Sequence, residues 1–209
     1  MRQTPEKWIA TYEARTPREL AEAYGQWACE YDRDTCQGMG YVGPTVAAGL
    51  LGKHLRSRCA RILDAGCGTG LVGQAMHRMG YRHLDATDLS QDMLDQAESK
   101  DVYNALFMAD MNKGYDIPAN TYDATICVGA FTYAHIGPEG FDELARVTKP
   151  GGFICFSLRE GAYQEYGYRD RLLDMEAAEV LELTEMVDTD YLTKKNVSAK
   201  YCICEVLKN

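Results

Sequence analysis

The 209-residue sequence predicts an α/β fold with a mostly parallel sheet and helices on both of its faces. Three observations support this fold class. Short apolar runs alternate with amphipathic stretches from Arg61 onward, a glycine-rich turn follows the first run, and residues 149–152 (Lys-Pro-Gly-Gly) end a helix before another apolar run. Alternation of this kind is typical of parallel strands joined by crossover helices.

The order of elements follows from the same periodicity. We expect strands near 60–64, 82–87, 104–109, 122–128 and 152–158, and helices near 71–79, 90–99 and 138–147. A Tyr-rich helix over 163–177 and strands over 180–187 and 198–207 complete a seven-stranded sheet. Before the first strand, Thr16, Pro17 and Glu19 indicate a helix start, because each suits a helix N-terminus.

The turn after the first predicted strand is the strongest indication of function. Asp64 stands at the strand tip, and Gly66, Gly68 and Gly70 leave bare backbone before the next helix. Bare backbone and helix N–H groups at such a turn can approach a ligand closely. Residues 68–73 also satisfy G-x-G-x-x-G, with Asp88 near the spacing of a ribose-binding acid, so a nicotinamide-dependent reductase is one alternative.

Asp64 favours a cationic ligand over a dinucleotide. A carboxylate at the strand tip repels the pyrophosphate that a dinucleotide brings to this turn. S-adenosylmethionine has no phosphate and carries an ammonium, a carboxylate and a sulfonium. Its net positive charge suits Asp64, and the amides of residues 70–72 can face its carboxylate.

Four segments in order resemble the class I S-adenosylmethionine-dependent methyltransferases, whose sheet is Rossmann-like. They are Leu63-Asp64-Ala65-Gly66-Cys67-Gly68-Thr69-Gly70, Asp88-Leu89-Ser90-Gln91-Asp92-Met93-Leu94, Tyr122-Asp123-Ala124-Thr125-Ile126-Cys127-Val128 and Leu144-Ala145-Arg146-Val147-Thr148-Lys149-Pro150-Gly151-Gly152. The flanking segments resemble the methyltransferase-like proteins of the Williams–Beuren region. The resemblance implies one domain over 1–209, with a helical cap (1–57), a cofactor-binding core (58–158) and a substrate-side helix with the final strands (159–209).

The resemblance also implies a cofactor site. Its residues are Asp64, Ala65, Gly66, Cys67, Gly68, Thr69 and Gly70 of the turn, Asp88 for the ribose hydroxyls, Leu89 and Met93 beside the adenine, Asp110 and Met111 near its amino group, Val128 and Gly129 near the methionine portion, and Tyr31 of the cap near the sulfonium. Alternatives remain at several positions. Met93 fits a core residue equally well. For Asp88 the alternative is a helix cap, and for Asp110 it is a solvated loop residue.

His135 and Tyr31 are the candidate catalytic residues, although His135 at a helix edge also fits a structural role. Arg159 is a candidate for holding an acidic acceptor. Tyr163, Tyr166 and Tyr168 fit either a lid over the acceptor or an ordinary helix surface. Because methyl transfer depends mainly on alignment of the reactants, it does not require a strong general base.

The composition of the chain limits the kinds of substrate and partner that we expect. The formal net charge is −9 and the only paired basic residues are Lys194 and Lys195, which disfavours nucleic acid as the substrate. No apolar run reaches the roughly 18 residues of a membrane span, and no signal peptide is evident. The spacing of the eight cysteines indicates no metal site and favours reduced thiols in a cytoplasmic protein.

The sequence therefore predicts an S-adenosylmethionine-dependent methyltransferase that acts on a small molecule, or alternatively a protein, and releases S-adenosylhomocysteine. The competing hypothesis is a catalytically silent module that keeps the cofactor site. The acceptor and the oligomeric state have no signature in the sequence.

Overall fold

The computed structural model describes residues 7–132, 136–159 and 161–208. The helices are α1 (Lys7–Glu13), α2 (Pro17–Asp32), α3 (Gly43–His54), α4 (Leu71–Arg78), α5 (Gln91–Glu98), α6 (Gly140–Val147), α7 (Ala162–Glu165) and α8 (Tyr168–Ala177). A π-helix, η1 (Arg33–Met39), and two 3₁₀ turns, η2 (Met111–Lys113) and η3 (Thr193–Lys195), complete the helical segments. The strands are β1 (Arg61–Ala65), β2 (His83–Asp88), β3 (Ala105–Met108), β4 (Tyr122–Phe131), β5 (Thr148–Arg159), β6 (Leu181–Leu192) and β7 (Val197–Val206).

The strands form one seven-stranded sheet in the order β3-β2-β1-β4-β5-β7-β6. The first five strands pair in parallel, and β7 pairs antiparallel with both β5 and β6. This arrangement confirms the predicted fold class. The chain moves outward from β1 to β3 and then returns to β4 on the other side of β1, so a crevice opens beyond the carboxyl ends of β1 and β4.

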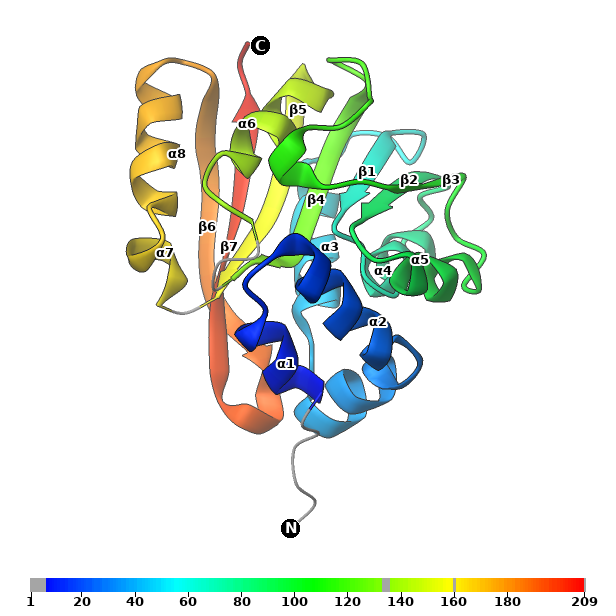
Figure 1. Ribbon diagram of the computed structural model, residues 1–209. Coiled ribbons are helices and arrows are strands. Elements are labelled where there is room, and N and C mark those ends of the chain that lie inside the picture. The colour runs from blue at the N-terminus through cyan, green and yellow to red at the C-terminus, as the bar shows by residue number, and fades with distance from the viewer. Residues whose placement is uncertain (1–6, 133–135, 160, 209) are drawn as a thin grey trace.

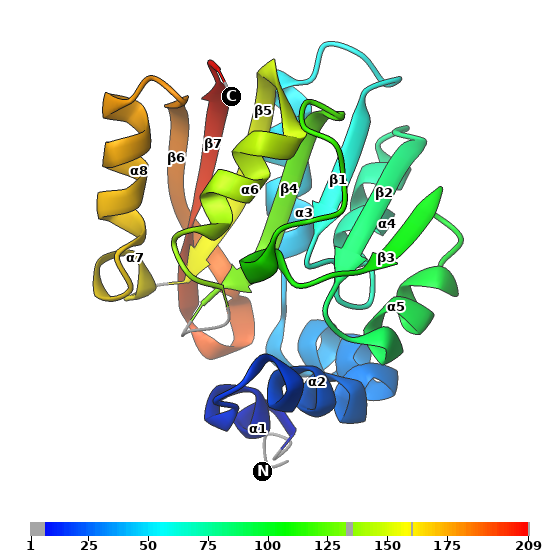
Figure 2. The same ribbon diagram turned by 45° about the horizontal axis from the view of Figure 1, so that its top comes forward.

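Alternate residues of each central strand face two different cores. Ile62, Ile126 and Cys155 pack with α3 and α4, whereas their neighbours Leu63 and Cys127 pack with α6 and α8. Figure 2 shows α6 and α8 in front of the sheet and α3 and α4 behind it. Successive side chains of a strand point to opposite faces of the sheet. Both faces are apolar because helices cover both of them.

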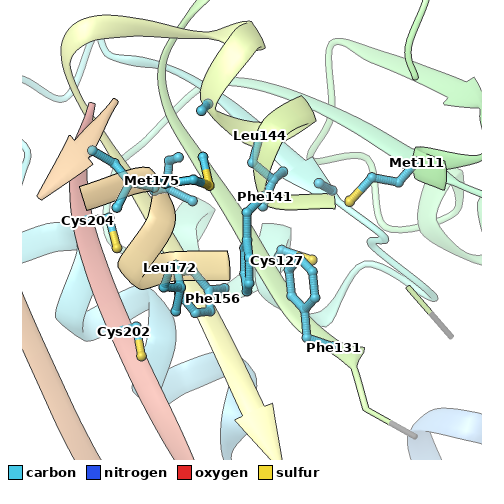
Figure 3. Close-up of a cluster of buried hydrophobic side chains, with 14 of the residues drawn as sticks. Met111, Cys127, Phe131, Phe141, Leu144, Phe156, Leu172, Met175, Cys202 and Cys204 are labelled. Atoms are coloured by element: carbon cyan, nitrogen blue, oxygen red, sulfur yellow. The ribbon is translucent and has the colours of Figure 1, made fainter. Parts of the chain in front are cut away.

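Aromatic rings fill the core beneath α6 (Figure 3). Phe141 stacks on Phe131 with ring centroids 4.4 Å apart, and its centroid lies 4.8 Å from that of Phe156. Cys127 and Cys155 lie within the strands and are fully buried, as expected of small apolar side chains.

The N-terminal helices lie across the end of the sheet at which β4 finishes (Figures 1 and 2). The predicted start of α2 is confirmed, since the Thr16 side chain accepts a hydrogen bond from the Glu19 N–H at 3.2 Å. α3 differs from α1 and α2, because it packs against β4 and β5 and covers one face of the sheet.

The helix expected over 163–177 is two helices. Gly167, at φ +74°, precedes the first turn of α8 and separates it from α7. This left-handed conformation interrupts the helix, which periodicity alone did not reveal. Tyr168 then points into the core and donates hydrogen bonds to the carbonyls of Thr132 (3.0 Å) and Ile136 (2.6 Å).

The aromatic core yields a test of stability. Phe141→Ala should lower the free energy of unfolding by about 3–5 kcal/mol, because the cavity left among packed rings collapses only in part. Urea denaturation measures the change. Leu173→Ala, on the exposed side of α8, is the matched control and should cost less than about 0.5 kcal/mol. Equal losses for the two variants would contradict the packing described here.

Candidate functional site

A cavity opens at the crevice beyond β1 and β4 and encloses about 970 Å³, including space open to solvent. Its walls come from the turn after β1, the ends of β2 and β4, the segment after β3, and α2. Twelve of the predicted cofactor residues line it, namely Tyr31, Gly66, Cys67, Gly68, Thr69, Asp88, Leu89, Met93, Asp110, Met111, Val128 and Gly129. The topology thus brings together residues that are far apart in the sequence.

The turn after β1 is anchored to the end of β2. The N–H groups of Gly66 and Cys67 donate to the carbonyl of Thr87 at 2.8 and 2.9 Å. Gly68 has a φ of +53°, and a Cβ built on it meets no atom within 4 Å. Open space therefore lies beside the Gly68 backbone at the cavity wall, where a ligand can approach and a side chain would intrude.

Asp88 holds this turn in place as well as lining the cavity. Its Oδ2 accepts a hydrogen bond from the Gly68 N–H at 2.8 Å, and its Oδ1 accepts one from the Ser90 N–H at 2.9 Å. Burial raises the pKa of Asp88, while these backbone donors oppose the rise. Each carboxylate oxygen can accept a second hydrogen bond, so the side chain remains able to bind a vicinal diol.

Asp64 lies beneath the turn and is 2% exposed. Together with Ala65 and Gly70 it is absent from the described cavity wall. Tyr103 donates a hydrogen bond to its Oδ2 at 2.5 Å and accepts one from the Gly73 N–H at 3.1 Å. Its Oδ1 is buried without a hydrogen-bond partner among the described residues. Burial raises the pKa of Asp64 to about 7, and the Tyr103 hydroxyl opposes that rise.

Asp110 caps the short helix η2, because its Oδ1 accepts a hydrogen bond from the Asn112 N–H at 3.1 Å. Its Oδ2 lies 3.3 Å from the ammonium of Lys113, which is largely exposed. Asp110 is therefore an ordered part of the cavity wall, and the solvated-loop alternative describes it poorly. Met93 is almost completely buried, so it belongs to the core and the cavity wall at once.

A cluster of polar side chains connects the N-terminal cap (residues 1–57) to the turn after β1. Thr69 Oγ1 donates to Asp32 Oδ1 at 2.5 Å, and Lys100 Nζ donates to Asp32 Oδ2 at 2.7 Å and to the Thr69 carbonyl at 2.5 Å. Asp32 is the last residue of α2, so these contacts fix the end of that helix over the glycine turn. Lys100 lies far from both partners in sequence, and no motif indicated it.

A second cavity of about 880 Å³, including space open to solvent, adjoins the first. The two share Tyr24, Tyr31, Tyr41 and Gly129 as lining residues. Gly129 has a φ of +85°, and a Cβ there would lie 2.9 Å from the Tyr191 hydroxyl and 3.0 Å from that of Tyr41. Only glycine therefore leaves room for both hydroxyls at the junction of the cavities.

Tyrosines surround this junction as neutral phenols. Burial raises the pKa values of Tyr24, Tyr31 and Tyr41 far above the usual value, and raises that of Tyr191 to about 12. The candidate Tyr31 lines both cavities, with its ring centroid 4.7 Å from that of Trp27. Its hydroxyl is consequently a hydrogen-bond donor near neutral pH, and not a base.

The other candidates have different outcomes. His135 lies outside the described residues. Tyr163, Tyr166 and Tyr168 line neither of these two cavities. Tyr168 belongs to the core under α6, and Tyr163 and Tyr166 pack against that core, so a lid over the acceptor stays a prediction. Arg159, at the end of β5, does line the second cavity.

Within the described ranges, no group of three His, Cys, Asp or Glu side chains is placed to hold a metal ion. In the same ranges, no helix is both long and apolar enough to cross a bilayer.

Residues 62–152 match a family described as "Methyltransferase domain". The chain is 34% identical to Methyltransferase-like protein 27 of Homo sapiens over 139 residues, which are 65% of this chain and 56% of that protein. It is 31% identical to the malonyl-[acyl-carrier protein] O-methyltransferase of Serratia marcescens over 151 residues, which are 71% of this chain and 56% of that protein. The chain thus spans less than two thirds of the length of these relatives.

Among solved structures, an S-adenosylmethionine-dependent methyltransferase of Leishmania major has a similar fold. Its TM-score is 0.70 at 17% identity, and the alignment covers 98% of this chain and 92% of that one. These matches confirm the fold class and the resemblance seen in the four sequence segments.

The contact of the cap with the turn can be tested through Lys100. Lys100→Met should lower the free energy of unfolding by about 1–3 kcal/mol, because the Asp32 carboxylate and the Thr69 carbonyl each lose a charged donor. Urea denaturation measures the loss. Lys53→Met removes a largely exposed ion pair with Glu185 and should cost less than about 1 kcal/mol. A Lys100 variant as stable as the Lys53 variant would contradict this role.

Proposed function

We propose that this chain, whose residues 62–152 match a methyltransferase domain, transfers a methyl group from S-adenosylmethionine to a small-molecule acceptor. The observation that carries the proposal is the pair of adjoining cavities, which share lining residues. The first contains the glycine turn and the predicted cofactor residues. The second begins at Gly129 and offers a place for an acceptor beside the methionine end of the cofactor. A silent cofactor-binding module has no need of the second cavity.

The residues of the first cavity fit the cofactor. Gly68 leaves open space where its backbone meets the cavity, and buried Asp64 has one oxygen without a hydrogen-bond partner among the described residues. A cationic ligand above the turn favours the ionised form of such a carboxyl group. When bound, S-adenosylmethionine supplies a methyl group on a sulfonium, which leaves as a neutral thioether.

Each predicted residue then has a role as part of this proposal. Asp88 binds the ribose hydroxyls, Leu89 and Met93 flank the adenine, and Asp110 with Met111 lies near its amino group. Val128 and Gly129 lie beside the methionine portion, and the Tyr31 ring and hydroxyl stabilise the sulfonium without becoming a competing nucleophile. Alignment of the acceptor with the methyl group removes roughly 7–11 kcal/mol of the barrier. His135 stays a candidate general base.

The cofactor site can be tested at Gly68. Gly68→Val should abolish binding of S-adenosylhomocysteine in calorimetry, because the side chain enters the space at the cavity wall. Gly151→Val is a matched control, since Gly151 also has a positive φ (+78°) and an unobstructed Cβ position but lies outside both cavities. The control should bind the ligand normally despite a similar backbone strain. Normal binding by the Gly68 variant would contradict the site.

The pKa of Asp64 predicts how cofactor binding depends on pH. Above a pH of about 7 the carboxyl group is ionised and attracts the cationic cofactor, whereas below it the proton must first leave. Affinity for S-adenosylmethionine should therefore fall as the pH falls below about 7, by up to about tenfold per pH unit, with proton release on binding. Calorimetry in buffers of different ionisation enthalpy measures both effects. Asp64→Asn should remove this dependence, and an unchanged profile in that variant would contradict the assignment.

A further inference from the structure

The second cavity is positively charged within an acidic chain. Arg159 and Lys195 are among its lining residues, whereas no Asp or Glu is present in the described part of its wall. The chain as a whole has a formal net charge of −9. The two charged side chains of the described wall are thus both cationic, and they favour an anionic ligand over a cationic one.

Aromatic residues make up half of the remaining described wall. Trp8 and Trp27, the only two tryptophans of the chain, both line the cavity together with Tyr12 and Tyr191. The Trp8 and Tyr12 ring centroids are 5.2 Å apart. The Arg159 guanidinium carbon lies 5.3 Å from the Tyr12 ring centroid, and its Nη1 donates a hydrogen bond to the Tyr12 hydroxyl. A ligand in this cavity therefore meets a guanidinium at the edge of an aromatic surface.

Trp8 also supplies a donor. Its indole Nε1 is buried and has no acceptor among the described residues. A buried N–H without an acceptor is unfavourable, so an oxygen-rich ligand beside Trp8 would relieve that cost. The guanidinium and the indole thus favour the same chemical class, a ligand with acceptor oxygens and negative charge.

The described residues of this wall include neither His nor carboxylate, and burial raises the pKa of each shared tyrosine. His135, the candidate general base, lies outside the described residues. An amine or an alcohol must lose a proton during methylation and is helped by a base. A carboxyl group, with an ordinary pKa near 4, is already ionised at neutral pH and has no proton to lose.

We propose that the acceptor is a carboxylate on an apolar or aromatic body, bound through Arg159, and that the product is its methyl ester; this inference rests on the proposed function. In the reaction, a lone pair of the carboxylate oxygen forms a bond to the methyl carbon. The bond between that carbon and sulfur breaks, and its electron pair stays on sulfur. The negative charge of the acceptor and the positive charge of the sulfonium cancel, so no proton is transferred.

Tryptophan fluorescence can report binding, because both tryptophans line the cavity. The full chain, saturated with S-adenosylhomocysteine, is titrated with phenylacetate, indole-3-acetate and hexanoate, and with the three corresponding amides. At least one carboxylate should bind about tenfold more tightly than its amide. Arg159→Gln should weaken the binding of that carboxylate by about 10- to 100-fold and leave the binding of the amide unchanged. Arg159→Lys keeps the charge and should retain part of the preference. Arg169→Gln, outside both cavities, should behave as the unchanged protein does.

Turnover with S-adenosylmethionine completes the test. Mass spectrometry should detect the methyl ester of the preferred carboxylate, and phenethylamine should remain unmethylated. No preference for any carboxylate over its amide, or transfer to phenethylamine alone, would overturn the inference and leave the methyltransferase proposal intact. If the folded protein fails to bind S-adenosylhomocysteine at all, the proposed function itself fails.

Discussion

The hydrogen bond from the Gly68 N–H to the Asp88 carboxylate, at 2.8 Å, is the contact on which the site depends. It joins the turn after β1 to the end of β2, the neighbouring parallel strand. Parallel strands whose helices lie on both faces leave their carboxyl ends open at one edge of the sheet. The Asp88 contact fixes the position of the turn at this edge, and the cavity wall follows from it.

The N-terminal helices supply part of the walls of two cavities at this open edge. Asp32, Thr69 and Lys100 fasten the end of α2 to the turn, and the Val42 N–H donates to the Tyr191 carbonyl at 3.1 Å, which connects the cap to β6. Tyr41 and Tyr191 then meet above Gly129, their ring centroids 5.0 Å apart. The second cavity, which we propose for the acceptor, is therefore shared between the cap and the last strands, whereas the first cavity, which we propose for the cofactor, belongs mainly to the core. Such a division lets acceptor choice vary while the cofactor site stays the same.

Periodicity and local motifs predicted the central sheet and most of the cofactor cavity. Strand and helix positions follow from local residue pattern, and Gly68 and Asp88 stand at turns that the pattern marks directly. The contacts that sequence reasoning missed are long-range. Tyr103 and Lys100 reach Asp64 and Thr69 from other segments of the chain, and no spacing rule connects them. The break at Gly167 was also missed, since glycine within a helical pattern is often tolerated.

Arg159 shows the same division between local and long-range information. Its place just after an apolar strand indicated a site residue, but its aromatic neighbours come from α1 and its fellow cation from η3. Only the folded chain brings Tyr12, Arg159 and Lys195 to one cavity. The sequence therefore indicated Arg159 as a candidate site residue, but only the structure shows which residues surround it.

The central claim is that the turn after β1 holds a positively charged nucleoside with an amino acid tail. Calorimetric titration of the folded protein, with S-adenosylmethionine and separately with NADH, tests this most directly. The account predicts saturable binding of S-adenosylmethionine at one site per chain and no comparable binding of NADH. Absence of binding at millimolar S-adenosylmethionine, or tighter binding of NADH, would contradict it.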